Sequence, residues 1–180
     1  MNMKYFKAVI GAAVLVILDQ YTKLLAVRHL MNKEAIPLIS DVFELKYLEN
    51  RGAAFGVFQD ARIMFLVMTV IVLFILVWAF IKIPSTKRYA PLYWTMVLLG
   101  AGAIGNCIDR VAKGYVVDFF YFKLINFPIF NVADIYVTCS VAALFVLILF
   151  KYKEQDLIVF SPKNSVKEAA KLKEKKDNEQ

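Results

Sequence analysis

The sequence predicts an all-α membrane protein with four transmembrane helices, a small extracytoplasmic β-sheet and both termini in the cytoplasm. Three observations predict this fold class. Hydrophobic residues make up 60% of the 180 residues, charged residues only 21%, and the mean hydropathy is +0.58. The apolar residues form long runs, and lysine and arginine gather in particular connections between these runs. This composition excludes a disordered chain, a nucleic-acid-binding tail protein and an ordinary cytosolic enzyme.

Four apolar segments are long enough to cross a bilayer, which takes roughly 20 residues for about 30 Å of hydrocarbon. They cover about residues 8–30, 63–81, 90–108 and 129–150. The first segment follows two lysines, as a signal peptide would, but it has no small-x-small cleavage site after its apolar core. We therefore expect it to be a retained helix.

The basic residues next to the segments predict the orientation, because cytoplasmic connections are enriched in lysine and arginine. The connection 82–88 contains three basic residues and no acid, and both the N-terminus and the end of the fourth segment are also basic. The basic residues concerned are Lys4, Lys7, Lys82, Lys87, Arg88, Lys151 and Lys153. The net charge of +7 therefore indicates topology, and we expect no nucleic-acid partner.

The two outer connections, 28–62 and 109–127, contain strand-like segments. Residues 43–48 alternate between apolar and charged, and residues 114–122 are β-branched and aromatic, so the two are expected to pair. We predict a membrane domain over residues 1–150, whose outer sheet includes 36–58 and 114–122. Residues 151–180 are predicted to be a basic, disordered cytoplasmic tail that could contact anionic inner-leaflet lipids.

Polar side chains inside the apolar segments are the most informative feature, because burying an Asp, Lys or Arg at the bilayer centre costs at least about 2.5 kcal/mol. With the predicted orientation, all of them fall toward the outer ends of three segments, and within each segment they recur at helical spacing. We expect them to converge at one depth, although an Asp–Lys pair alone could be a structural tie. These residues are Asp19, Lys23, Asn106, Asp109, Arg110, Asn131 and Asp134.

Among the residues of this sequence, the carboxylates are the best candidates for catalysis. With one histidine and no G-x-S-x-G or glycine-rich phosphate motif, the chain lacks the usual metalloprotease, serine hydrolase and ATPase signatures. Asp118 in the outer strand segment and Asp134 in the fourth apolar segment are separated by a short connection and can face each other. Such a pair can activate water against an amide without a metal or cofactor, or it can relay protons in a transporter. Their placement alone supports both functions equally.

Five sequence blocks then point to one family. They are residues 19–23 (DQYTK), 50–55 (NRGAAF), 105–110 (GNCIDR), 116–119 (VVDF) and 130–134 (FNVAD). In this order, on four apolar segments, they resemble lipoprotein signal peptidase, the type II (prolipoprotein) signal peptidase of bacteria. The resemblance covers most of residues 1–150.

The resemblance implies an aspartyl endopeptidase of the bacterial inner membrane, with its active site toward the extracytoplasmic side. It would cut the signal peptide of a prolipoprotein just before a diacylglyceryl-modified cysteine, with Asp118 and Asp134 as the catalytic dyad. It also implies an outer β-cradle with a short surface helix near residues 59–62, and no cofactor or metal. We expect a monomer that contacts membrane lipids and the prolipoprotein. The other matching motif positions, expected to bind substrate or support the dyad, are Asp19, Lys23, Asn50, Gly52, Asn106, Asp109, Arg110, Asn131 and Ala133.

Three questions stay open at the level of sequence. Arg110 could pair with Asp109 or Asp19, or could contact substrate carbonyls. Residues 53–58 could form an apolar lid over the site. The third question is whether the protein has another function. A proton- or ion-coupled transporter would need a polar path to the cytoplasmic side, which the apolar inner halves of the segments do not provide. A non-catalytic assembly protein would tolerate replacement of both aspartates.

Overall fold

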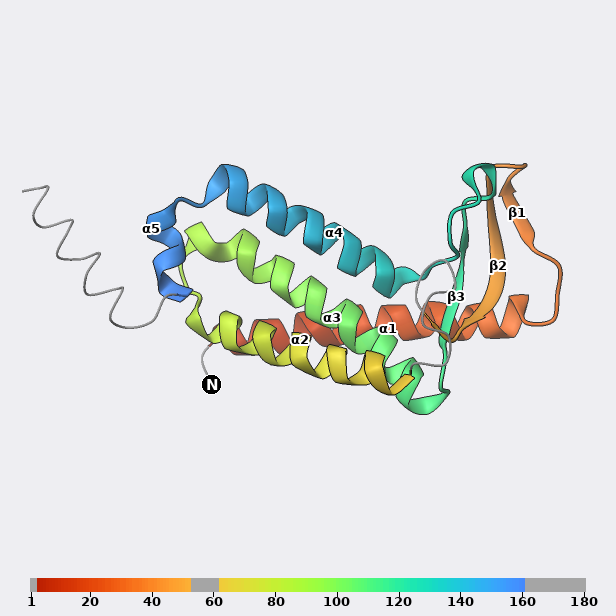
Figure 1. The fold of residues 1–180 in the computed structure, drawn as a ribbon, viewed down its shortest axis with the longest axis horizontal. Helices are drawn as coiled ribbons and strands as arrows, with labels where there is room; N and C mark the ends of the chain where they lie inside the picture. Colours follow the sequence, from red (N-terminus) through yellow and green to blue (C-terminus); the bar gives the residue numbers. More distant parts are fainter. Residues whose placement is uncertain (1–2, 53–61, 161–180) are drawn as a thin grey trace, which may run out of the picture.

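Four long helices form a bundle with a small sheet at one end in the computed structural model, which describes residues 3–52 and 62–160 (Figure 1). All four are long and apolar enough to cross a membrane, so the prediction of a multi-pass membrane protein is confirmed. The predicted lid at 53–58 and most of the surface helix near 59–62 lie outside the described residues. The four helices are α1 (Met3–Leu30), α2 (Arg62–Lys82), α3 (Ala90–Ala112) and α4 (Val132–Val146).

Two helix boundaries differ from the predicted segments in a way that shapes the site. Helix α3 continues to Ala112, one turn beyond the apolar run, so its polar end stays helical. Helix α4 begins at Val132 because Asn131 caps it. The Asn131 side chain accepts a hydrogen bond from the Asp134 backbone N–H, and the Asp134 carboxylate accepts one from the Asn131 N–H. This capping box satisfies two backbone donors. At its far end α4 continues into a π-helical turn, η4 (Leu147–Lys151).

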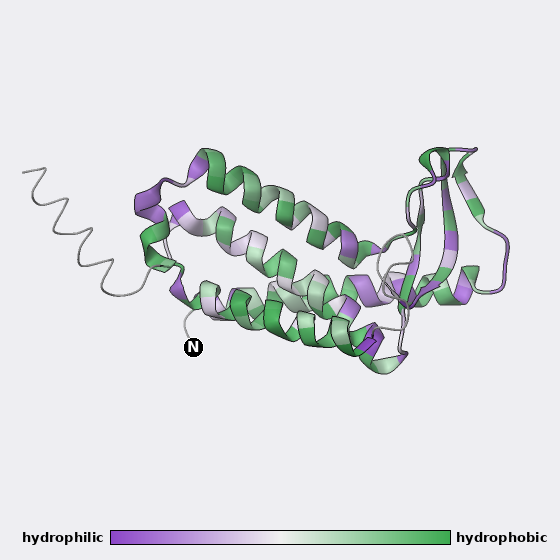
Figure 2. Cartoon of the chain, in the orientation of Figure 1, coloured by the Kyte–Doolittle hydropathy of each residue, from purple (hydrophilic) through white to green (hydrophobic). Residues whose placement is uncertain are grey.

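Helix α3 is the centre of the bundle and contacts the other three helices. It lies very close to α4, since a Cβ placed on Gly102 would be 2.6 Å from the backbone oxygen of Ala133. Small residues allow this close approach between membrane helices. Helix α2 is apolar on all sides and has one buried residue, Ala79. Its exposed apolar surface, green in Figure 2, suits a lipid environment.

The three strands form an antiparallel sheet in the order β1–β2–β3. They are β1 (Ile36–Ile39), β2 (Phe43–Asn50) and β3 (Val116–Tyr121). The predicted pairing of the two outer strand segments is confirmed, because β2 pairs with β3. The sheet packs on the last turns of α1 through a small core that contains Ala26, Leu30, Val117 and Phe119. The fold therefore anchors β3, which carries Asp118, on a membrane helix.

A backbone brace joins β3 to the segment that enters α4. The Phe130 N–H donates to the Phe120 oxygen (3.0 Å), and the Phe120 N–H donates back to the Phe130 oxygen (2.8 Å). The connection between them, which includes the short 3₁₀-helix η3 (Lys123–Ile125), loops out beyond the brace. Because Asp118 lies two residues before Phe120 and Asn131 follows Phe130, the brace brings the two polar residues together.

The opposite end of the bundle is closed by residues that follow α4. Tyr152 is buried and stacks on Tyr89 with the ring centroids 5.6 Å apart, while Arg88 forms an ion pair with Asp156. Tyr89 belongs to the 3₁₀-helix η2 (Lys87–Tyr89), and Asp156 belongs to α5 (Glu154–Leu157), which η5 (Ile158–Phe160) follows. Part of the segment assigned to a disordered tail from its polar composition is thus helical and packed. Residues 161–180 lie outside the described residues.

Candidate active site

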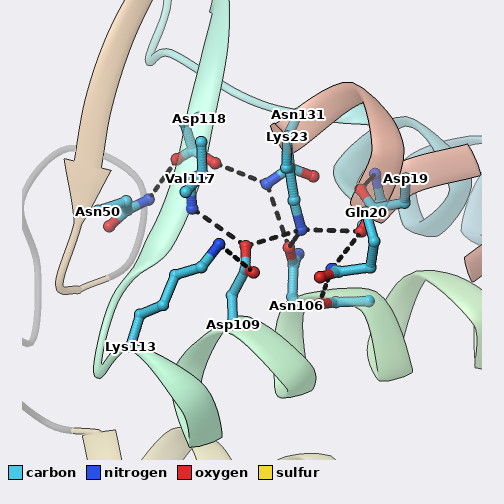
Figure 3. Close-up of polar contacts among 12 residues, drawn as sticks. Asp19, Gln20, Lys23, Asn50, Asn106, Asp109, Lys113, Val117, Asp118 and Asn131 are labelled. Atoms are coloured by element: carbon cyan, nitrogen blue, oxygen red, sulfur yellow. Dashed lines mark hydrogen bonds and ion pairs between the residues drawn. The ribbon is translucent and has the colours of Figure 1, made fainter. Parts of the chain in front are cut away.

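Six of the seven polar residues that the sequence predicts to converge are joined by hydrogen bonds or ion pairs at the sheet end of the bundle, together with Asn50 and Asp118 of the sheet. Figure 3 shows most of this group. They come from five elements: α1, α3 and α4 of the bundle and β2 and β3 of the sheet. Several are fully buried, although ionisable side chains are rarely buried unless they are paired. The hydrogen bonds and ion pairs among them form one connected network.

Lys23 is the centre of the membrane-embedded part of this network. Its Nζ lies 2.9 Å from Asp19 Oδ2 and 3.2 Å from Asp109 Oδ2, and it donates to Asn106 Oδ1 at 2.9 Å. The Lys23 side chain is completely buried. One ammonium therefore holds a residue of α1 and two residues of α3, and its three donors match three acceptors. The Asp19–Lys23 ion pair therefore has a structural role, as one interpretation of the sequence predicts, and it is also part of the site.

Asp19 connects α1 to α4. Its Oδ1 accepts a hydrogen bond from the backbone N–H of Ala133 (2.9 Å), in the first turn of α4. Its Oδ2 accepts one from Gln20 Nε2 (3.1 Å), which also donates to the Gly105 oxygen (3.0 Å). A Cβ on Gly105 would lie 2.5 Å from Asp19 Oδ2, so only glycine leaves room for this carboxylate. The negative charge also lies near the N-terminus of α4, where it is favoured.

Asp109 connects α3 to the sheet. Its Oδ1 accepts from Lys113 Nζ (3.0 Å), and its Oδ2 accepts from the backbone N–H of Val117 (3.2 Å). Asp109 is fully buried, so both carboxylate oxygens are satisfied within the protein. The residue before Asp118 is thereby fixed to the end of α3. Gly114, with φ of +85°, lets the chain turn from α3 into β3.

Asp118 is held by two amide side chains. Asn50 Nδ2 donates to its Oδ2 (2.8 Å), and Asn131 Nδ2 donates to its Oδ1 (2.6 Å). The sheet register explains the first bond, because Asn50 lies opposite Val116 and therefore diagonal to Asp118. Asn50 is itself oriented by the Gly52 N–H, which donates to its Oδ1 (3.0 Å).

The Asp134 carboxylate accepts hydrogen bonds from two asparagines. Asn106 Nδ2 donates to its Oδ1 (2.7 Å), and the backbone N–H of Asn131 donates to its Oδ2 (3.0 Å). Asn131 also donates to Asn106 Oδ1 (3.1 Å). Asn131 thus contacts both aspartates, one through its side chain and one through its backbone. The network runs from Lys23 through Asn106 to Asp134, and through Asn131 to Asp118.

The electrostatics of Asp118 favour a shared proton. Its side chain is almost completely buried, and burial together with the charge of Asp134 raises its pKa to about 7. The hydrogen bonds from Asn50 and Asn131 and the charge of Lys23 oppose this rise. Two nearby carboxylates in a poorly hydrated site do not both ionise readily. Near neutral pH the pair can therefore hold one proton and one negative charge, as acid–base catalysis requires.

A cavity of about 500 Å³ lies beside Asp134, which forms part of its wall together with Asn50. Most of the remaining wall is apolar and comes from the connection into α4 and from the outer face of that helix. Cavity residues include Gly52, Phe65, Arg110, Phe127, Pro128, Ile129, Phe130, Ile135, Thr138 and Cys139. Such a mixture of an apolar wall and a few polar groups is typical of a ligand site.

Comparison with known proteins agrees with this geometry. The family profile described as signal peptidase (SPase) II matches residues 11–150. The chain belongs to the signal peptidase II family. A lipoprotein signal peptidase from Caldanaerobacter subterraneus subsp. tengcongensis is 45% identical over 145 residues, which cover 80% of this chain and 97% of the relative. One from Brevibacillus brevis is 47% identical over 133 residues, covering 74% of this chain and 88% of the relative.

The fold is also similar to that of a solved structure described as a bacterial membrane enzyme, determined by the in meso method at 2.3 Å resolution. The TM-score is 0.70 at 32% sequence identity, and the match covers 82% of this chain and 92% of that chain. The family resemblance read from the five sequence blocks is thus confirmed, and the chain is a member of a protease family.

The position of Arg110 answers a question that the sequence left open for this signal peptidase II. Asp19 and Asp109, its two possible partners, are paired with lysines. In the described part of the chain Arg110 instead packs over the Phe65 ring, with its guanidinium 4.6 Å from the ring centroid, and lines the cavity. Its charge therefore faces the space where a ligand would lie.

Three residues contribute to the site without having been predicted to do so. Lys113 could have been found from its spacing, since it lies one helical turn after Asp109. Gln20 lies inside the first sequence block, but nothing in its residue type indicates that it would bridge two helices. Phe65 lies in the featureless apolar run of α2, so its stacking under Arg110 depends on tertiary structure alone.

Proposed function

We propose that this protein removes signal peptides from diacylglyceryl-modified prolipoproteins, with Asp118 and Asp134 as the catalytic dyad. The family supports the removal of signal peptides from prolipoproteins. The observation that carries the catalytic assignment is that Asn131 contacts both aspartates and that Asp134 lines the 500 Å³ cavity.

The reaction follows from one protonated and one ionised carboxylate. The ionised aspartate takes a proton from a water molecule, whose oxygen attacks the carbonyl carbon of the scissile peptide bond. The protonated aspartate donates its proton to the carbonyl oxygen. When the tetrahedral intermediate collapses, the C–N bond breaks, the leaving nitrogen takes the proton from one aspartic acid, and the other, ionised aspartate takes a hydroxyl proton from the intermediate, which restores one proton on the dyad. The hydrogen bonds from Asn50, Asn106 and Asn131 keep both carboxylates in place without reorganisation.

The cavity suits a substrate that combines a peptide with acyl chains. Phe127 and Ile129 give an apolar wall that could accept the lipid on the modified cysteine. Arg110 lines the same cavity and could donate hydrogen bonds to substrate carbonyl oxygens. Cleavage just before the modified cysteine would then place the scissile carbonyl at Asp134, between these two regions.

The distribution of basic residues supports an orientation with both termini in the cytoplasm and the site toward the extracytoplasmic side of the inner membrane. Lys82 ends α2, and Lys87 and Arg88 lie in the connection between α2 and α3, at the end of the bundle away from the sheet (Figures 1 and 2).

The proposal is tested by a gel-shift assay with a purified lipid-modified prolipoprotein and detergent-solubilised enzyme. Asp118→Asn and Asp134→Asn are each expected to abolish cleavage, because asparagine can neither take nor give the required proton. Asp41→Asn is the matched control, since Asp41 is an exposed aspartate in the turn between β1 and β2. Near-normal turnover by either dyad variant would refute the assignment, and loss of wild-type activity in a chelator would indicate a metal-dependent reaction instead.

A further inference from the structure

A second cavity lies at the end of the bundle opposite the dyad. It has a volume of about 370 Å³ and lies between the start of α1, the connection from α2 to α3, and the start of α3. The described residues that line it include three lysines, a serine, a threonine and two tyrosines, and none of them is an acid. The lysines and the two aliphatic hydroxyl groups that a ligand could contact are Lys4, Lys7, Lys87, Ser85 and Thr86. We refer to this space as the basic cleft.

One of the three ammonium groups is fixed in position by the fold. Lys4 Nζ donates to the backbone oxygens of Phe80 (2.7 Å) and Ile83 (2.5 Å), at the end of α2. The backbone oxygen of Lys4 in turn accepts a hydrogen bond from the Tyr93 hydroxyl (2.6 Å), on α3. These bonds hold a positive charge in the wall of the cleft before any ligand arrives. Lys7 and Lys87, by contrast, are exposed and can turn toward a ligand.

The cleft opens toward the surface that would face lipid. Trp94 lines it and packs on α1, where a Cβ on Gly11 would lie 2.8 Å from the indole ring. About half of the Trp94 side chain is still exposed, and the apolar side chains of Phe6 and Ile10, on the same part of α1 as Gly11, are exposed to a similar extent. Tryptophan at the end of a membrane helix is typical of the boundary between acyl chains and headgroups.

We propose that the basic cleft binds the phosphate of an anionic phospholipid, with the acyl chains lying along the exposed face of α1 beside Trp94. A phosphate oxygen accepts the charge-assisted hydrogen bonds that Lys7, Lys87 and the two hydroxyl groups can donate. Basic pockets between membrane helices at the cytoplasmic side are suited to anionic headgroups. The apolar surface that continues from the cleft favours a lipid over free phosphate, and this site is separate from the catalytic reaction.

The test measures lipid binding to the purified, detergent-solubilised protein by native mass spectrometry, with phosphatidylglycerol, phosphatidylcholine and inorganic phosphate titrated separately. We expect phosphatidylglycerol to bind and the double variant Lys7→Gln/Lys87→Gln to bind it about thirty-fold more weakly. This factor corresponds to about 2 kcal/mol at 1.4 kcal/mol per tenfold, or about 1 kcal/mol for each lysine. Retained prolipoprotein cleavage by the variant shows that it is folded.

The matched control is Lys82→Gln/Lys151→Gln. It removes the same charge from the same end of the bundle, but neither lysine lines the cleft. The control is expected to keep wild-type affinity. Equal affinity of the cleft variant and the wild type would overturn the proposal, and so would an equal loss in the control. Equal binding of phosphatidylcholine and phosphatidylglycerol would refute selection of an anionic headgroup. Displacement of phosphatidylglycerol by millimolar inorganic phosphate would identify a free-phosphate site instead.

Discussion

Replacing Lys23 by methionine should be the most damaging single change in the membrane-embedded part of the site. Methionine fills much of the same space but removes the charge that contacts Asp19, Asp109 and Asn106. In the described chain, Asp109 keeps a second lysine, Lys113 at 3.0 Å, whereas Asp19 loses the one cation that the structure gives it. The variant therefore leaves a fully buried carboxylate with hydrogen bonds but without a counter-ion.

Removal of one partner from a buried ion pair typically costs about 3–5 kcal/mol. We expect Lys23→Met to lower the free energy of unfolding by about this amount, measured by denaturant titration in detergent micelles. The double variant Asp19→Asn/Lys23→Met should recover about 2 kcal/mol or more, because the unpaired charge is gone. Lys113→Met is the control, since it contacts the same Asp109 but is about one-third exposed. It should cost about 1 kcal/mol or less.

Two results would refute this reasoning. A loss below about 1 kcal/mol for Lys23→Met would mean that the pair is screened by water that reaches the bundle. A double variant no more stable than Lys23→Met would mean that the damage comes from packing and not from an uncompensated charge on Asp19.

The other predictions concern the dyad, the helix packing and the C-terminal segment. The pKa of about 7 for Asp118 implies that kcat/KM for prolipoprotein cleavage decreases above pH 7, where the dyad loses its proton. A profile of kcat/KM from pH 5 to 9 tests this, and a kcat/KM that stays constant above pH 7 would contradict it. Because the native state keeps this proton between the ordinary value of 3.8 and 7, the free energy of unfolding should decrease as pH rises through that window. Gly102→Ala should destabilise the protein by about 1–3 kcal/mol, since the added Cβ meets α4. Gly100→Ala is the control and should change thermal stability little, because a Cβ at Gly100 meets no atom within 4 Å. Equal melting temperatures of the two variants would contradict this. Tyr152→Ala should expose residues 152–160 to limited proteolysis while cleavage of prolipoprotein is retained, and an unchanged digestion pattern would count against the packed arrangement.

The features that could be predicted from the sequence are those with a strong physical signal. Apolar length identifies the four spans, and the cost of burying Asp19 and Lys23 requires partners for them at the same depth. The alternating pattern around Leu45 and the β-branched residues around Val117 predict a strand pair, which the structure contains. Of the predicted dyad, Asp134 lines the cavity and Asp118 is joined to it through Asn131; their catalytic role stays a prediction, which the cleavage assay tests.

The features that could not be predicted depend on geometry across elements. Asn131 has no sequence signal for contacting both aspartates, because this requires the brace between Phe120 and Phe130 and the first turn of α4. The packing of Tyr152 was hidden by the polar residues around it, since composition averages over a window and misses one buried aromatic side chain. Arg110 had two possible acidic partners in the sequence, Asp19 and Asp109, and the structure excludes both, because Lys23 and Lys113 pair with these carboxylates.

Because of the backbone brace between β3 and α4, the positions of the catalytic residues do not depend on the length of the connection between Phe120 and Phe130. Asp118 and Asn131 are positioned by residues on the near side of the brace, while residues 123–126 form a protruding turn on its far side. Extra residues in that turn would lengthen the connection between β3 and α4 without moving the carboxylates of Asp118 and Asp134 apart. The turn is therefore a site where a short peptide tag could be inserted in a working enzyme, whereas an insertion between Asp118 and Phe120 would shift the dyad out of register.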